Sequence, residues 1–227
     1  MSATHQPSPV GVIGAGSFGA AIANLLAHNN PEVLLFSRRE DLAQAINQTH
    51  RHPSLNVEIS QRVKATYDLQ EVAERCTLIF PVVSSEGFRE MMQGLGPLLR
   101  PYHLLIHGTK GFDVKKLSEE DLREGKITRE NVRTMSEVIR EESSVVRIGC
   151  LSGPNLASEI FDGQPTATVI ASKFDEVVSL GKRALSSRFF QVFGTYEIQG
   201  AELAGALKNI IAIGSGILGG LGMGKNI

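Results

Sequence analysis

The chain of 227 residues has no tryptophan, and aromatic residues make up only 6% of it. Proteins that hold single-stranded nucleic acid stack the bases on aromatic side chains, so a surface of that kind is not expected. The formal net charge is −1, from 23 Lys and Arg against 24 Asp and Glu. The chain therefore lacks the basic field that attracts nucleic acid or an anionic membrane surface, and we expect neither partner.

Cysteine is scarce, with two residues that both lie beside or within apolar stretches, Cys76 and Cys150. No CxxC pair is present, so buried thiols in a reducing compartment are favoured over a disulfide or redox pair. The six histidines form no helical pair with metal-ligand spacing, and we expect no metal site. The N-terminal stretch is polar and contains proline, unlike a signal peptide.

Long hydrophobic runs are also lacking. The best candidate for a membrane span, residues 210–221, has twelve residues, of which five are glycine or serine. A spanning helix needs about 20 apolar residues, so this run predicts a buried core helix and no membrane span. Together with the polar N-terminus, this favours a cytoplasmic protein.

The first 36 residues have the pattern of one strand–helix–strand unit. A β-branched run at 10–13 precedes a glycine-rich turn, a helical pattern at 20–29 and a second apolar run at 32–36. Further continuous apolar runs lie at 78–83, 104–106, 148–151 and 167–170. Continuous runs are typical of strands buried on both faces, so they predict a mostly parallel sheet covered by helices.

We therefore predict an α/β fold: a Rossmann-type, doubly wound, mostly parallel sheet over residues 1–197. Residues 198–227 are expected to begin an all-α substrate domain that is truncated here. Within 113–143, 16 of 31 residues are charged, which predicts a solvated surface insertion rather than a partner-binding element. The helical spacing of Val132, Met135, Val138 and Ile139 predicts an amphipathic helix in this insertion.

The turn after the first strand fits the pattern G-x-G-x-x-G, with its glycines at Gly14, Gly16 and Gly19. The pattern alone is weak, but here it follows a strand and opens a helix, the context of a dinucleotide-binding turn. Gly14 permits the tight turn, Gly16 lets the backbone approach a pyrophosphate, and Gly19 lets helix and strand pack closely. The helix N-terminus then offers unpaired N–H groups to the phosphates.

The end of the second strand carries Ser37, Arg38 and Arg39, with Glu40 only afterwards. A carboxylate here would hold the ribose 2′-hydroxyl of NAD, whereas arginines accommodate the 2′-phosphate of NADP. The arginine pair favours NADPH or dual use, and a pair of merely exposed arginines is the alternative.

Three further segments carry polar groups with chemical potential. Lys110 follows an apolar strand, and ligands of parallel sheets bind at the carboxyl ends of strands. The segment from Ser152 to Ala157 also follows a strand, and its small residues would let a ligand come close. Lys208 lies inside an otherwise apolar helical stretch, where it must either extend to solvent or meet a partner.

With these segments together, the chain resembles the bacterial NAD(P)-dependent glycerol-3-phosphate dehydrogenases. The matching stretches are GAGSFGAAIA, residues 77–85, HGTKG, LSGPNLASE, GQPTATVIAS and GAELAGALKNIIAIGSGILGGLG, and they follow the family's order. The resemblance implies reduction of dihydroxyacetone phosphate to sn-glycerol 3-phosphate, a backbone for phospholipid synthesis. It also implies a homodimer when the chain is full length.

Residue by residue, the resemblance makes Lys208 the catalytic proton donor and acceptor, and gives Lys110 contacts to both substrate and cofactor. Gly153 and Asn155 fall at substrate-contacting positions. Four residues fall at cofactor-contacting positions, namely Ser17, Phe18, Arg38 and Ala157. An ammonium near the ketone could stabilise and then protonate the alkoxide that hydride transfer leaves. We expect Lys110 and partial burial to lower the pKa of Lys208.

The sequence departs from the family pattern in several places. A valine-proline-serine motif reads Val83-Ser84-Ser85, Phe18 stands where tryptophan is frequent, and an Asn-x-x-Tyr-Leu-Pro segment is poorly kept around residues 50–60. The family's phosphate-clamping arginine lies in a C-terminal region beyond residue 227, so this chain is expected to bind cofactor and to turn over weakly. Two alternatives stay open: another two-domain hydroxyacid-type dehydrogenase, such as a ketopantoate-type enzyme, and a non-catalytic NAD(P)-sensing module.

Overall fold

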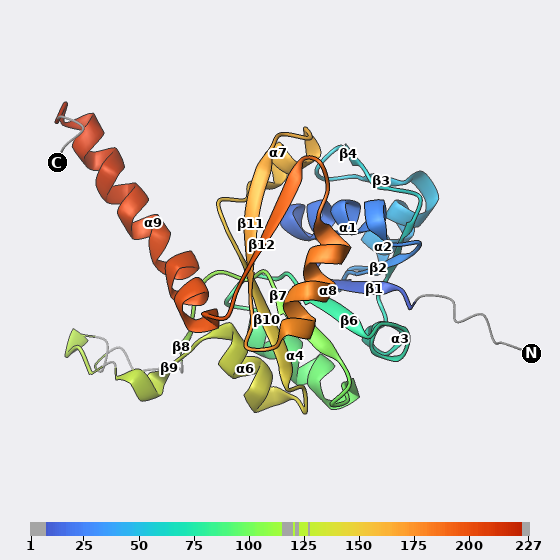
Figure 1. Cartoon of the computed structure of the whole chain (residues 1–227), viewed down its shortest axis with the longest axis horizontal. Helices are drawn as coiled ribbons and strands as arrows, with labels where there is room; N and C mark the ends of the chain where they lie inside the picture. Colours follow the sequence, from blue (N-terminus) through green and yellow to red (C-terminus); the bar gives the residue numbers. More distant parts are fainter. Residues whose placement is uncertain (1–7, 115–119, 121–122, 127, 224–227) are drawn as a thin grey trace, which may run out of the picture.

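The computed structural model describes residues 8–114, 120, 123–126 and 128–223. Its main element is an eight-stranded sheet in the order β12-β11-β10-β7-β6-β1-β2-β5 (Figure 1). The predicted apolar runs form β1, β2, β6, β7, β10 and β11, and the first four of these strands are buried at every residue. The edge strands β5 and β12 carry exposed residues and were not predicted. The strands are β1 (Val10–Ile13), β2 (Val33–Phe36), β5 (Val63–Thr66), β6 (Leu78–Pro81), β7 (Leu104–His107), β10 (Arg147–Ser152), β11 (Thr166–Ala171) and β12 (Phe190–Thr195).

The sheet is doubly wound, as predicted. From β1 the chain moves outward through β2 to β5, then returns to place β6 on the other side of β1. The strand order therefore reverses between β1 and β6, where ligands of such sheets bind. All neighbouring strands run parallel except β10 and β11, so the prediction of a mostly parallel sheet is confirmed.

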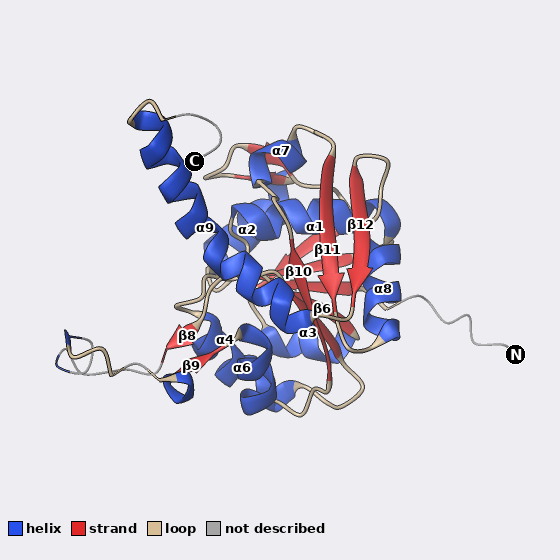
Figure 2. Ribbon diagram, turned by 60° about the vertical axis from the view of Figure 1, so that its left-hand side comes forward, coloured by secondary structure: helices blue, strands red, loops and turns tan. Residues whose placement is uncertain are grey.

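Helices cover both faces of the sheet (Figure 2). One face packs against α1 (Ser17–Asn29), α2 (Glu40–Thr49) and α8 (Asp175–Leu185), and the other against α3 (Leu69–Arg75), α4 (Phe88–Leu95) and α6 (Met135–Glu142). Successive residues of a strand point to opposite faces, so Val12 belongs to the first core and Ile13 to the second. The remaining elements are β3 (Arg51–His52), β4 (Val57–Glu58), the 3-10 turns η1 (Gly96–Leu98) and η2 (Arg129–Asn131), β8 (Asp113–Val114), β9 (Val132–Arg133) and α7 (Ala157–Phe161).

Both cysteines are buried free thiols, as predicted. The charged insertion is described only in part, since residues 115–119, 121–122 and 127 lie outside the described residues, as do 1–7 and 224–227. Its amphipathic helix is confirmed as α6, but including Val132 was wrong because that residue pairs in β9. The helix begins later because Thr134 caps it and Glu137 reaches back to the Thr134 N–H.

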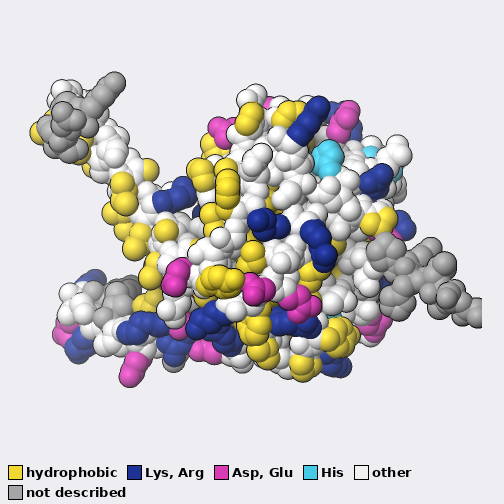
Figure 3. All heavy atoms as spheres, viewed as in Figure 1, with side chains coloured by type: hydrophobic (Ala, Val, Ile, Leu, Met, Phe, Trp, Pro, Cys, Tyr) yellow, Lys and Arg dark blue, Asp and Glu magenta, His cyan; other side chains and the backbone are white. Residues whose placement is uncertain are grey.

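Helix α9 (Ile198–Gly220) differs from its prediction in how much of it is exposed. It has 23 residues, and by length and composition alone it could cross a membrane, although helices of soluble proteins pass the same test. The buried core helix expected at 210–221 is wrong within the described chain: Ile210, Ile211 and Ile213 are each more than 60% exposed. Figure 3 shows hydrophobic side chains gathered along this helix. The predicted boundary at 198 coincides with the first residue of α9, and the division into domains stays a prediction.

The sheet interior provides a test of the fold. We expect Phe80→Ala to lower the free energy of unfolding by about 3–5 kcal/mol, because it leaves a cavity at a fully buried site. Phe193 is the matched control, since its ring is 57% exposed on β12 and its replacement by alanine should change stability by about 0.5 kcal/mol or less. Urea unfolding of both variants measures the difference, and equal losses would contradict this placement of the two rings.

Candidate functional site

A cavity of about 780 Å³ opens at the carboxyl ends of β1 and β6. Its lining includes all the residues that were predicted to bind a cofactor, and also Asn155, which was predicted to contact the substrate. Other polar and apolar residues, which were not singled out from the sequence, complete it. Gly153 and Lys208 do not line it. The predicted residues that do are Gly14, Gly16, Ser17, Phe18, Gly19, Arg38, Arg39, Lys110, Asn155 and Ala157.

The three glycines of the turn have three different surroundings. Gly14 has a φ of +114°, and a Cβ there would lie 2.3 Å from the Val82 carbonyl oxygen. A Cβ on Gly19 would lie 1.8 Å from the Gly14 carbonyl oxygen, so a side chain would push α1 off the turn. A Cβ on Gly16 would meet nothing within 4 Å. Since Gly16 lines the cavity, that open space is available to a ligand.

Helix α1 directs its N-terminus into the cavity. Its N-cap is Gly16, which provides no side-chain cap, and no acidic residue lies in the first turn. The first N–H groups of a helix lack intrahelical partners and carry partial positive charge, so this end suits a phosphate group. His52 supports the turn from β3, because its buried ring places Nε2 2.8 Å from the Ala15 carbonyl oxygen.

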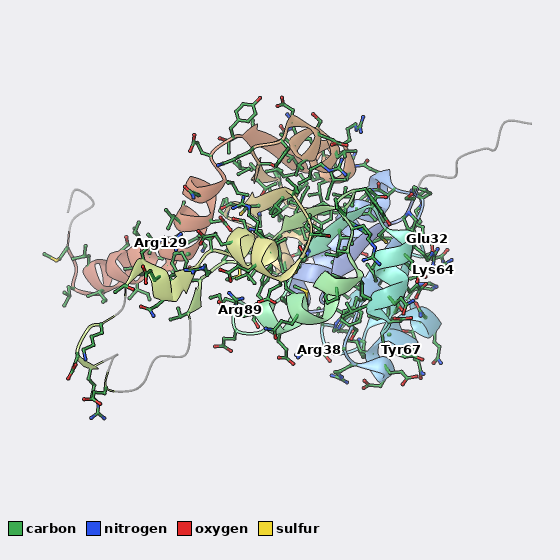
Figure 4. The ribbon with its side chains drawn as sticks, turned by 90° about the horizontal axis from the view of Figure 1, so that it is seen from below. Glu32, Arg38, Lys64, Tyr67, Arg89 and Arg129 are labelled. Atoms are coloured by element: carbon green, nitrogen blue, oxygen red, sulfur yellow. The ribbon has the colours of Figure 1, made fainter. Side chains whose placement is uncertain are left out.

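The two arginines after β2 are not equivalent. Arg39 donates through Nε to the Asp41 carboxylate at 3.1 Å, and this hydrogen bond holds the pKa of Asp41 below its usual value. Arg38 is exposed at the cavity and has no ion-pair partner within the described residues (Figure 4). Both arginines were predicted to bind the 2′-phosphate of NADP, but among the two only the Arg38 guanidinium is without an ion-pair partner in the described residues.

Lys110 lies half-buried at the end of the cavity. Its Nζ donates to the Gly153 carbonyl oxygen at 2.9 Å, and the neighbouring Thr109 hydroxyl donates to the Val83 carbonyl oxygen at 2.7 Å. Burial lowers the pKa of Lys110, and the positive charge of Lys208 lowers it further.

Asn155 has one satisfied and one unsatisfied end. Its side chain is buried, and Nδ2 donates to the Thr168 hydroxyl at 2.9 Å. Its Oδ1 has no hydrogen-bond partner within the described residues. Because a buried acceptor without a partner is unfavourable and Asn155 lines the cavity, this residue suits a hydrogen-bond donor from a ligand.

Gly153 does not line the cavity but contacts Lys110, which does. A Cβ there would lie 3.1 Å from the Ala167 carbonyl oxygen and from Thr168, so its small size lets β10 and β11 approach closely. Its carbonyl oxygen holds Lys110. The structure therefore connects Gly153 to the site through Lys110.

Lys208 is carried by α9, but it is exposed, and among the described residues it donates only to Asn209 Oδ1 at 2.9 Å. The partial burial expected for it is wrong within the described chain, because α9 leaves the sheet beyond Gly205. One turn earlier, a Cβ on Gly205 would lie 3.3 Å from the Ser152 hydroxyl and 3.8 Å from the Lys110 side chain.

A buried ion pair fixes the start of α9. The Glu202 carboxylate lies 3.0 Å from Nε2 of His107 and accepts from the backbone N–H and the hydroxyl of Ser136, each at 2.8 Å. Burial alone would raise the pKa of Glu202, but the hydrogen bond and charge of His107 and the Ser136 donors lower it. Burial alone would lower the pKa of His107, but the interactions with the Cys150 side chain and the Glu202 carboxylate outweigh it, so the pKa of His107 is raised.

The sequence reasoning missed four of these residues: His52, His107, Ser136 and Glu202. His107 and Glu202 stand inside the quoted stretches HGTKG and GAELAGALKN, and a charged residue in an apolar helix is a signal of pairing. No spacing rule connects positions that are 95 residues apart, so the pair emerges only from the fold.

The cavity fits a dinucleotide. It has an open glycine position beneath the α1 N-terminus, an unengaged arginine after β2 and an unpaired acceptor at Asn155. These groups lie where strand order reverses, the usual place for a dinucleotide in this class of sheet. Hydrophobic side chains complete the lining, including Phe18, Leu42 and Val83.

Family models match most of the chain. The model described as the NAD-dependent glycerol-3-phosphate dehydrogenase N-terminus matches residues 9–178, and that of the C-terminus matches residues 197–227. A curated glycerol-3-phosphate dehydrogenase [NAD(P)+] of Acinetobacter baylyi is 38% identical over 96% of this chain and 57% of that protein. The enzyme of the same name from Pseudomonas aeruginosa PAO1 is 36% identical over 97% of the chain and 61% of its own length.

Solved structures agree. Glycerol-3-phosphate dehydrogenase of Coxiella burnetii superposes with a TM-score of 0.80 at 31% identity, covering 96% of this chain and 63% of that one. A ketopantoate reductase of Ralstonia eutropha gives a TM-score of 0.60 at 18% identity, covering 86% of this chain and 59% of its own, and shows the shared fold alone. The chain thus spans about three fifths of the length of the relatives it matches.

The glycines of the turn give a matched pair of variants. We expect Gly19→Ala to lower the free energy of unfolding by at least about 2 kcal/mol, because its Cβ would collide with backbone. Gly16→Ala should leave stability nearly unchanged and weaken NADPH binding by about tenfold or more, since the methyl group occupies ligand space. Thermal unfolding and fluorescence titration separate the two effects. Unchanged cofactor affinity in a folded Gly16→Ala variant would contradict this assignment.

Proposed function

The chain belongs to the NAD-dependent glycerol-3-phosphate dehydrogenase family, and on that premise we propose that it reduces dihydroxyacetone phosphate to sn-glycerol 3-phosphate with NADPH or NADH. The observation that carries the proposal is the approach of α9 to Lys110: Lys110 lies in the wall of a dinucleotide-sized cavity, and a Cβ on Gly205, one turn before Lys208, would lie 3.8 Å from its side chain. The product would supply phospholipid synthesis.

The nicotinamide cofactor supplies the hydride when it is bound. Gly14, Gly16 and Gly19 shape its phosphate site, and the first turn of α1 donates N–H groups there through Ser17 and Phe18. Ala157 lies in the same wall and leaves room for the cofactor.

Two lysines and an asparagine handle the substrate in this proposal. Lys208 stabilises the developing alkoxide by its positive charge and delivers a proton to that oxygen. Lys110 holds the substrate and the cofactor together, since its Nζ is already fixed by the Gly153 carbonyl oxygen. The Oδ1 atom of Asn155 accepts a hydrogen bond from a substrate hydroxyl, which would satisfy an acceptor that otherwise has no partner among the described residues.

NADPH is the favoured cofactor. Arg38 is unengaged at the cavity, whereas Arg39 is tied to Asp41. A free guanidinium suits the extra phosphate of NADPH, and no carboxylate stands at the position that would hold the ribose hydroxyl of NAD. Arg39 then contributes by position and charge rather than by a direct grip.

Helix α9 is proposed to belong to a protein interior rather than a membrane. Its first two turns are tied to the sheet by Glu202 and Gly205, and the family's C-terminal model covers it. Location in the cytoplasm and assembly as a homodimer stay predictions.

Two other functions are distinguishable by experiment. A ketopantoate-type reductase shares the fold, but the family models favour glycerol-3-phosphate chemistry. A sensing module would bind the cofactor without turnover. The substrate and the role of Lys208 therefore decide between the three.

The first measurement compares the binding of NADPH and NADH by fluorescence titration. We expect Arg38→Ala to remove about 1.5–3 kcal/mol of NADPH binding energy, a loss in affinity on the order of 10- to 100-fold, and to leave NADH nearly unchanged. Arg39→Ala is the control and should lose less, because Arg39 is already paired with Asp41. Equal losses for both cofactors would contradict the 2′-phosphate assignment.

Lys208 is tested under single-turnover conditions, with protein in excess over NADPH so that slow chemistry registers. Lys208→Ala should slow NADPH oxidation by dihydroxyacetone phosphate about 100- to 10,000-fold, the usual contribution of a general acid. Its NADPH affinity should stay unchanged, because Lys208 does not line the cavity. Oxidation at the unmodified rate would exclude Lys208 as the acid, and fast turnover with ketopantoate instead would reassign the substrate.

A further inference from the structure

The buried carboxylate of Glu202 joins three elements that are far apart in the sequence. Oε1 lies 3.0 Å from His107 Nε2 at the end of β7 and 2.8 Å from the backbone nitrogen of Ser136, in the first turn of α6. Oε2 accepts from the Ser136 hydroxyl at 2.8 Å. Both oxygens are thus satisfied by a histidine, a hydroxyl and a helix N-terminus, all of which favour the ionised form.

The same cluster stands next to both proposed site lysines. His107 precedes Lys110 by three residues on the loop after β7, and Glu202 precedes Lys208 by six residues on α9. Between them, Gly205 approaches the Lys110 side chain, and the Ser152 hydroxyl donates to the Ala201 carbonyl oxygen at 3.0 Å. The distance between the two lysines is therefore set by how α9 is docked.

Few other contacts hold α9 to the rest of the described chain. Ile198 is buried in the second core at its first residue, whereas every residue from Leu207 to Ile213 is exposed. Figure 2 shows the helix crossing the sheet near β10 and then extending away from it. The docking is concentrated in the first two turns, where Glu202 is the only charged side chain.

We propose that Glu202 is a positioning residue: its carboxylate, bound to His107 and Ser136, sets the docking of α9 and thereby holds Lys208 beside Lys110. This inference rests on the proposed roles of the two lysines. Neither Glu202 nor His107 lines the cofactor cavity, so the cluster acts on the proton-handling side of the site and leaves cofactor binding alone.

The test uses Glu202→Gln, which keeps the size of the side chain and removes its charge. The matched control is Glu197→Gln, an exposed carboxylate at the N-cap of the same helix. The main readout is the pH dependence of Lys110 labelling by an amine-specific reagent, resolved by peptide mass spectrometry. Hydrogen exchange of the α9 amides and NADPH titration accompany it, and none of these needs turnover.

We expect the midpoint of Lys110 labelling to shift to higher pH in Glu202→Gln, since Lys208 moves away and Lys110 is less buried. Amide exchange in the first two turns of α9 should accelerate about 100-fold, as the loss of a buried ionic partner implies. The NADPH dissociation constant should stay within about twofold of the unmodified protein, and Glu197→Gln should change none of the three.

Ser136→Ala serves as the milder variant if Glu202→Gln does not fold, because the His107 contact and the Ser136 N–H remain. It should accelerate exchange about tenfold and shift the labelling midpoint in the same direction. An unchanged Lys110 midpoint in a folded variant would overturn the proposal. Failure of the unmodified protein to bind either cofactor would instead overturn the proposed function. The labelling result would still decide whether Glu202 positions α9, because labelling needs neither cofactor nor turnover.

Discussion

Helix α1 packs directly against the turn that precedes it, where Gly19 meets the Gly14 carbonyl oxygen with no room for a side chain. That contact brings the N-terminus of α1 directly to the end of β1. It also holds the turn against Val82, so the ends of β1 and β6 are fixed together. The contacts of Gly19 with Gly14 and of the turn with Val82 hold β1, β6 and α1 together at the point where the strand order reverses. The position of the cavity at this point is therefore fixed by close packing.

A second constraint operates on the other half of the sheet. The antiparallel pairing of β10 with β11 leaves the segment from Gly153 to Asn155 folded against Thr168, which fixes the carbonyl that holds Lys110. Helix α9 then docks on β10 through Gly205, and on β7 and α6 through Glu202. The end of the cavity at the glycine turn thus depends on steric fit, whereas the end at Lys110 depends on hydrogen bonds and charge.

The sequence predicted the parts of this arrangement that follow local rules. The strand and turn from Val10 to Gly19 were evident because periodicity and glycine spacing are local signals. The start of α6 was misjudged, because the capping box of Thr134 and Glu137 begins the helix after Val132. The burial of α9 was misjudged, because an apolar composition does not show whether a helix is covered. The division of labour between Arg38 and Arg39 required coordinates, because it depends on the rotamer that pairs Arg39 with Asp41.

The buried pair of Glu202 and His107 shows why such features escape sequence reasoning. A buried ion pair gains little over apolar packing, yet the loss of one partner is destabilising by about 3–5 kcal/mol, so its benefit is definition of geometry. An apolar residue at 202 would remove the directed contacts to His107 and Ser136 and leave the docking of α9 to shape alone. A carboxylate with three directed donors permits one docking only. We therefore interpret Glu202 as the residue that fixes the position of α9 and, in the proposed site, the position of Lys208, six residues further along.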